Sequence, residues 1–96
     1  MDIIKENWLE IKETVRREYN LSSISYNTWI EPLEIHQVEN DVVSILIPSD
    51  KAHALNYIST KYKSYFQVTI SELFNHTYDV AFILESDVRN SSYEEI

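Results

Sequence analysis

The sequence predicts an α+β domain in which two helices precede two strands, a long helix and a final strand, the order ααββαβ. Two segments carry apolar residues at spacings of three and four, the period of an amphipathic helix. Short runs rich in Val and Ile, bounded by Asn, Asp, Ser and Pro, are typical of strands and turns. A pair of strands followed by a helix and a further strand implies a small three-stranded sheet packed against helices. The 96 residues are the size of a single domain.

The first two elements are predicted to be helices. The first covers about residues 2–19, with Asp2 as a suitable N-cap and the charged residues on its outer face. Its apolar stripe consists of Ile4, Trp8, Ile11, Val15 and Tyr19. The second helix covers about residues 23–30. We expect it to end there because Glu31 precedes a proline, and that position disfavours helical backbone.

Two strands are predicted next. Leu33 and Ile35 alternate with polar neighbours, and a turn signal at residues 39–41 leads into the segment 42–47. This second strand is apolar at nearly every position, which indicates a central strand or one whose outer face is also covered. Pro48 ends it.

The last helix and the last strand complete the predicted domain. Ser49 caps a helix over about residues 50–74, and a strand follows over residues 78–84. We therefore expect an interaction domain over residues 1–84. Residues 85–96 show no periodicity and are expected to be an acidic, flexible tail or the start of a linker.

The composition excludes several kinds of chemistry. Without glycine, neither a phosphate-binding motor loop nor a dinucleotide fingerprint can form, and without cysteine there is no thiolate or disulfide. The three histidines, His36, His53 and His76, lack metal-binding spacing. The serines near residue 22 are better explained as helix caps than as nucleophiles. We therefore expect no enzyme activity, no cofactor and no metal.

The charge and the chain start indicate the kind of partner. Sixteen acidic residues against eight basic ones give a net charge of −8, which disfavours non-specific binding to nucleic acid and favours protein partners. Residues 1–6 have no basic stretch followed by an apolar run, so we do not expect them to form a signal peptide, and no apolar stretch approaches membrane-spanning length. We expect a cytoplasmic protein with no membrane partner.

Several short strings, taken in order, resemble the N-terminal domain (domain I) of the bacterial DnaA replication initiators. The first is the aromatic Trp8 of the first helix. The second is residues 25–33, SYNTWIEPL, in which Trp, Pro and Leu follow an aromatic residue at the family's spacing. The turn at 39–41, the strand end IPS at 47–49 and the string NYISTKY at 56–62 follow in matching order. The resemblance covers about residues 4–84.

The resemblance implies a KH-like fold and a protein-protein interaction role in DNA replication initiation. In the family this domain mediates self-association of the initiator, docks the replicative helicase and receives initiation regulators. We therefore expect the chain to bind itself or full-length DnaA, and then helicase or regulators. The alternative is a weak single-stranded DNA-binding domain, although KH domains grip single strands with a glycine-containing loop. The sequence leaves open whether the chain is part of a full initiator or a free-standing relative.

The expected interaction residues are Ile4, Trp8, Ile11, Ser25 and His53. The first three form an apolar stripe that is wide for one small core, so it is a candidate surface patch, although a core role suits Trp8 equally well. The resemblance places the helicase contact at Ser25 and at Ala52 or His53. The family has an acidic residue at the first position and an apolar residue at the second, so Ser25 departs from the pattern. We expect Trp29, Leu33, Tyr57 and Tyr62 to line the core, with the tyrosine hydroxyls at its rim.

Overall fold

The computed structural model describes residues 2–88 and confirms the α+β order ααββαβ. The predicted first and second helices are each divided in two. The elements are α1 (Ile3–Glu6), α2 (Trp8–Glu18), α3 (Ser23–Ser25), the π-helical turn η1 (Tyr26–Ile30), β1 (Glu34–Glu39), β2 (Val42–Ile47), the 3₁₀ helix η2 (Ser49–Ala54), α4 (Leu55–Leu73) and β3 (Asp79–Leu84). Residues 85–88, placed in the predicted tail, form one helical turn, and the rest of that tail lies outside the described residues.

The predicted first helix is interrupted at Asn7. Asp2 caps its start as expected, since the carboxylate accepts hydrogen bonds from the backbone N–H groups of Ile4 and Lys5 at 3.0 and 3.3 Å. The amide nitrogen of Asn7 donates to the carbonyl of Ile3 at 2.8 Å. Asparagine is a poor helix former because its side chain competes for backbone groups in this way. The spacing of the apolar residues continues across Asn7, so the sequence pattern does not indicate the break.

The predicted second helix begins as expected but ends in an unusual turn. The hydroxyl of Ser22 caps it by accepting the N–H of Ser25 at 3.1 Å. The N–H of Glu31 then donates to the carbonyl of Tyr26, five residues back, at 2.8 Å, which is a π-helical bond. Pro32 follows directly and has no N–H with which to continue the helix. The long helix also differs from its prediction, because its first turns are 3₁₀ and regular α-helix begins only at Leu55.

The sheet has the order β1-β2-β3, which confirms the prediction that β2 is central. β1 and β2 form an antiparallel hairpin, whereas β2 and β3 run parallel and are connected through η2 and α4. The hairpin turn consists of Asn40 and Asp41, both at positive φ (52° and 63°), as in a type I′ turn. A register irregularity between Ile35 and Gln37 bends the edge strand β1.

Asparagine takes the place of glycine where two helices end. Asn20 after α2 and Asn75 after α4 have φ values of 50° and 49°. In each case the next residue donates its N–H to a carbonyl five residues back: Leu21 to Arg16 at 3.0 Å and His76 to Ser71 at 3.1 Å. This is the Schellman arrangement, and asparagine is the residue that tolerates it best after glycine.

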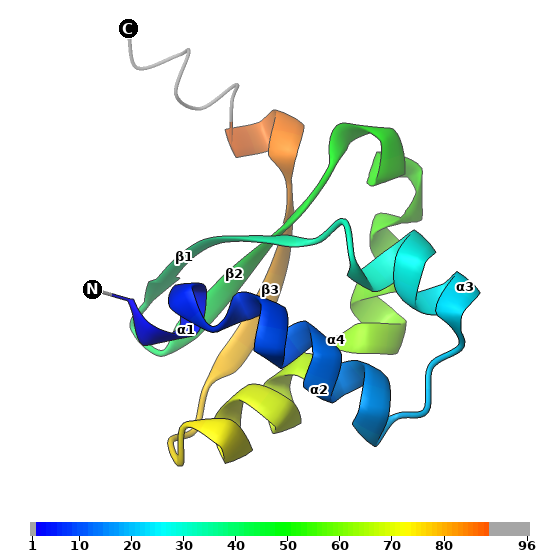
Figure 1. Cartoon of the computed structure of the whole chain (residues 1–96). Helices are drawn as coiled ribbons and strands as arrows, with labels where there is room; N and C mark the ends of the chain where they lie inside the picture. The colour runs from blue at the N-terminus through cyan, green and yellow to red at the C-terminus, as the bar shows by residue number, and fades with distance from the viewer. Residues whose placement is uncertain (1, 89–96) are drawn as a thin grey trace, which may run out of the picture.

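The helices and one face of the sheet enclose the core. α4 packs against β3, α2 packs against α4, and α1 lies beside β1 (Figure 1). Along β2, buried and half-buried residues alternate, so one face of the sheet points inward. The core side chains are Ile4, Trp8, Ile11, Val15, Tyr26, Ile30, Leu33, Ile35, Val43, Ile45, Ile47, Ala54, Ile58, Tyr62, Phe66, Ile70 and Val80.

Candidate protein-docking surface

The stripe expected to form a surface patch belongs to the core. Ile4, Trp8 and Ile11 are 1%, 7% and 0% exposed. The Trp8 ring stacks on Phe66 of α4, with centroids 5.4 Å apart, and its indole N–H donates to the carbonyl of Leu33 at 2.8 Å. The expectation of an exposed patch at these three residues is therefore wrong. The stripe is fully used in packing α1 and α2 against α4 and the start of the sheet.

A buried lysine fixes the same helix to the segment before β1. Lys12 is 5% exposed, and its ammonium group donates to the carbonyls of Glu31 at 2.8 Å and Leu33 at 3.4 Å. The Glu34 carboxylate lies 4.0 Å away, and the Trp8 ring is 5.8 Å from the same nitrogen. A buried ammonium group needs such partners. Sequence periodicity placed Lys12 on the polar face, and no local signal identified its burial.

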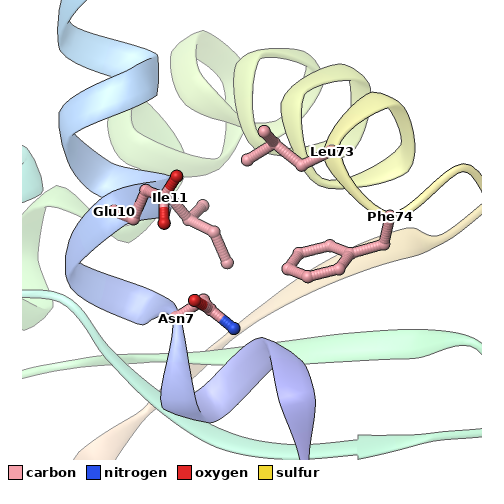
Figure 2. Close-up of a pocket in the computed structure, with 5 residues that line it drawn as sticks. All are labelled: Asn7, Glu10, Ile11, Leu73 and Phe74. Atoms are coloured by element: carbon pink, nitrogen blue, oxygen red, sulfur yellow. The ribbon is translucent and has the colours of Figure 1, made fainter.

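A shallow groove of about 110 Å³ lies between the start of α2 and the end of α4. Asn7, Glu10 and Ile11 line it from the α2 side, and Leu73 and Phe74 line it from α4 (Figure 2). Leu73 is 43% exposed although it is apolar, and Phe74 is half-buried. The groove is thus lined by both polar and apolar side chains, with Asn7 and Glu10 on the α2 side. It is an opening of the kind that a partner's apolar side chain can fill.

A second surface combines aromatic rings with lysines where η1 meets η2 and α4. Trp29 is half-buried and Tyr57 is 45% exposed, and their ring centroids lie 5.2 Å apart. Lys51 lies 5.4 Å from the Trp29 ring and Lys61 lies 5.5 Å from the Tyr57 ring, both within cation–π range. The ammonium group of Lys61 also donates to the Tyr57 hydroxyl at 3.1 Å. This hydrogen bond raises the pKa of Lys61, so the group stays charged.

The aromatic residues were predicted with mixed success. Leu33 and Tyr62 are buried in the core as expected, but Trp29 and Tyr57 reach the surface. The Tyr62 hydroxyl is not at the rim: it is buried, and among the described residues 2–88 it has no hydrogen-bond partner. Burial raises the pKa of Tyr62. Two tyrosines on one helix can face different environments, and spacing alone does not say which one is covered.

Of the two residues expected at a helicase contact, His53 lies on η2, which carries part of this second surface, and Ser25 directly precedes η1. Ser25 is half-buried at the end of α3, and His53 is exposed on η2. The contacts of Trp29 with Lys51 and Tyr57 hold η1 against η2 and α4. His53 thus lies two residues from Lys51 on the same element, and Ser25 lies at the start of the turn that carries Trp29.

The described residues show no built metal centre or membrane span. Within residues 2–88, no group of three or more acidic or histidine side chains could hold a metal ion. His76 instead pairs with Asp41, with 3.0 Å between its Nε2 and the carboxylate. In the same part of the chain, no helix is long and apolar enough to cross a bilayer.

Helices packed on one face of a three-stranded mixed sheet, in the order ααββαβ, define a small α+β domain of KH-like order. The chain belongs to the family of the DnaA N-terminal domain, whose sequence model matches residues 5–76. This confirms the resemblance carried by the ordered strings.

Two similar proteins carry the name chromosomal replication initiator protein DnaA. The protein from Lachnoclostridium phytofermentans is 33% identical over 89 residues, which is 91% of this chain and 20% of that protein. The protein from Geotalea daltonii is 32% identical over 75 residues, or 78% of this chain and 16% of that protein. The chain thus spans a fifth or less of the length of these relatives.

Proposed function

We propose that this chain is a protein-docking domain of bacterial replication initiation. It associates with the N-terminal domain of a DnaA initiator, in a second copy of itself or in full-length DnaA. Family membership supports the cellular process, and the groove between α2 and α4 supports the docking role. The observation that carries the proposal is Leu73, an apolar side chain 43% exposed at that groove.

A partner of the same fold suits such a groove. In a two-fold arrangement the same groove of both copies faces itself, so each copy offers an apolar side chain and a hollow to the other. Leu73 and Phe74 supply the apolar area, and Asn7 and Glu10 lie where a polar rim is needed. The net charge of −8 opposes association, so salt should strengthen the complex by screening the repulsion.

Sedimentation equilibrium tests the docking surface with one pair of variants. Leu73→Glu places a carboxylate in the groove and should weaken self-association, and binding to the N-terminal domain of a DnaA protein, by about tenfold or more. Leu9→Glu is the matched control. Leu9 is more exposed than Leu73, at 68%, and helical periodicity puts it on a different side of α2 from Asn7, Glu10 and Ile11. Equal effects of the two variants would contradict the proposal.

Docking of helicase or regulators is proposed for the aromatic–lysine surface of Trp29, Lys51, Tyr57 and Lys61, beside Ser25 and His53. These rings and ammonium groups lie near the position where the family resemblance places the helicase contact. With serine in place of an acidic residue at position 25, we expect a weaker contact with the basic side of a partner. Ser25→Glu should strengthen helicase capture in a direct binding assay if the family geometry is kept.

Single-stranded DNA is the alternative ligand of the same surface. Exposed aromatic rings beside lysines are the features on which unpaired bases stack and phosphates bind. Added salt would weaken this binding, whereas it should strengthen the proposed self-association. Titration with an oligothymidylate at low salt separates the two functions: micromolar binding lost in Tyr57→Ala would favour the alternative.

A further inference from the structure

The sheet has a second face, which points away from the core. The register of the three strands places nine side chains on it in three rows: Glu34–Leu46–Ile83, Gln37–Ser44–Ala81 and Glu39–Val42–Asp79. The apolar residues among them are Val42, Leu46, Ala81 and Ile83, all half-buried. We refer to these nine residues as the outer sheet face.

The helices do not cover this face within residues 2–88. On the central strand, Val43, Ile45 and Ile47 are fully buried, whereas the residues between them keep part of their surface exposed. The partly buried apolar strand residues that pack against the core are Val38, Phe82 and Leu84, all on the inner face of the sheet. The outer sheet face is therefore an apolar patch open on the solvent side.

Carboxylates surround the apolar centre of the outer sheet face. Glu34, Glu39 and Asp79 occupy three of its corners. Glu85, just after β3, lines a pocket together with Glu34 and Leu46 at the fourth. The side chains of Glu34 and Asp79 are 69% and 59% exposed. Two lysines approach this rim: Lys12 at 4.0 Å from Glu34 and Lys63 at 3.9 Å from Asp79. Four carboxylates thus outnumber two ammonium groups.

One end of this face is hollowed into a small pocket. Its walls are Pro32, Leu46 and Pro48, with Glu34 and Glu85 beside them. The Glu85 carboxylate accepts hydrogen bonds from the N–H and hydroxyl of Ser49, both at 3.3 Å, which hold it at the pocket. Apolar walls with a carboxylate on either side match the methylene stem and charged head of a lysine or arginine.

We propose that the outer sheet face docks a basic, amphipathic segment of a partner protein, at a site separate from the α2–α4 groove. The partner's apolar side chains cover Val42, Leu46, Ala81 and Ile83. One of its lysines or arginines enters the pocket between Glu34 and Glu85. The charge on the rim selects this occupant: a second copy would bring carboxylates against carboxylates, and phosphates would be repelled in the same way.

The test measures binding of a synthetic amphipathic helix made only of leucine and lysine, with a peptide of leucine and glutamate as control. We expect saturable binding of the basic peptide that weakens with salt, and no binding of the acidic one. Amide shifts in NMR spectra should centre on Leu46, Ala81 and Ile83. The charge-reversed pair Glu39→Lys with Glu85→Lys should weaken the affinity by about tenfold or more.

A matched control separates this site from general electrostatic attraction. The pair Glu18→Lys with Glu72→Lys makes the same change in net charge on exposed positions of α2 and α4 and should leave the affinity within about twofold. Ile83→Lys, which puts a cation at the apolar centre, should abolish binding while the chain still unfolds cooperatively. Equal losses in the two pairs, or shifts confined to α2 and α4, would overturn the proposal. So would a dimer that dissociates in Ile83→Lys, since the occupant would then be a second copy.

Discussion

Trp8 and Trp29 lie on neighbouring helical segments, yet their surroundings differ in nearly every respect. Trp8 is 7% exposed, stacks on Phe66 and donates its indole N–H to a backbone carbonyl of the segment before β1. Trp29 keeps part of its surface exposed, meets Tyr57 at 5.2 Å and lies under the ammonium group of Lys51. One tryptophan closes the core, and the other contributes to a surface.

The contrast shows where a docking surface can lie. A residue that makes a buried hydrogen bond and a ring stack within its own domain has no surface left for a partner. The side of α2 that faces α4 is therefore structural, and we propose that docking uses the groove beside it and the aromatic–lysine surface.

Truncating Trp8 should have the largest effect. Trp8→Ala removes the stack on Phe66 and leaves the carbonyl of Leu33 with one donor fewer, so we expect a loss of about 3–5 kcal/mol of unfolding free energy. Urea denaturation followed by circular dichroism measures it. A variant that stays as stable as the parent but no longer self-associates would show that Trp8 belongs to an interface.

Replacing Lys12 should have the second-largest effect on stability, because Lys12 also holds α2 against the segment before β1. Lys12→Met keeps the aliphatic stem but removes the donor to the carbonyls of Glu31 and Leu33. Because buried groups are then left unpaired, the free energy of unfolding should fall by about 1–3 kcal/mol. The exposed Lys5→Met is the control and should change stability by less than about 0.5 kcal/mol. Equal effects would mean that the buried hydrogen bonds contribute nothing net.

Truncating Trp29 should cost less than truncating Trp8. Trp29→Ala should lower the free energy of unfolding by about 1–2 kcal/mol, because the ring is only half-buried. Self-association should be unchanged. The same denaturation experiment, combined with sedimentation, measures both quantities. A loss as large as that of Trp8→Ala would contradict the division between core and surface.

Alkaline pH should produce the smallest effect, through Tyr26 on η1. Burial, with a hydrogen bond to Glu13, raises the pKa of Tyr26 from its ordinary value of 10.0 to about 12. The folded state therefore favours the neutral phenol. The resulting stability is complete below pH 10 and is lost as the pH rises toward 12. Tyr26→Phe should unfold with a shallower dependence on pH in this window, and an unchanged slope would contradict the assignment.

The order of the elements could be predicted because local patterns determine it. The strand 42–47, the stop at Pro48 and the turn at residues 39–41 are all where the sequence indicates. The break at Asn7 and the π-helical turn before Pro32 depend on hydrogen bonds that periodicity does not contain. The residue type at the positive-φ positions could be predicted, because a chain without glycine must use Asn or Asp there, but their exact positions could not.

The site could be predicted far less well. Ile4, Trp8 and Ile11 form one stripe, and a stripe predicts burial without saying whether its own domain or a partner covers it. Lys12 looks like a surface residue until the segment 31–34 is placed beside it. Leu73 follows the helical spacing of α4, and this spacing alone does not show that it is 43% exposed. The outer sheet face needs the pairing register, which no single strand contains.

Mapping the interface by NMR tests the central claim most directly. The chain, labelled with ¹⁵N, is titrated with the unlabelled N-terminal domain of the DnaA protein from Lachnoclostridium phytofermentans, a relative 33% identical to it. We predict that the amide signals of Asn7, Glu10, Ile11, Leu73 and Phe74 shift together and saturate. Shifts confined to Trp29, Lys51 and Tyr57, or no shifts at any concentration, would contradict docking through the α2–α4 groove.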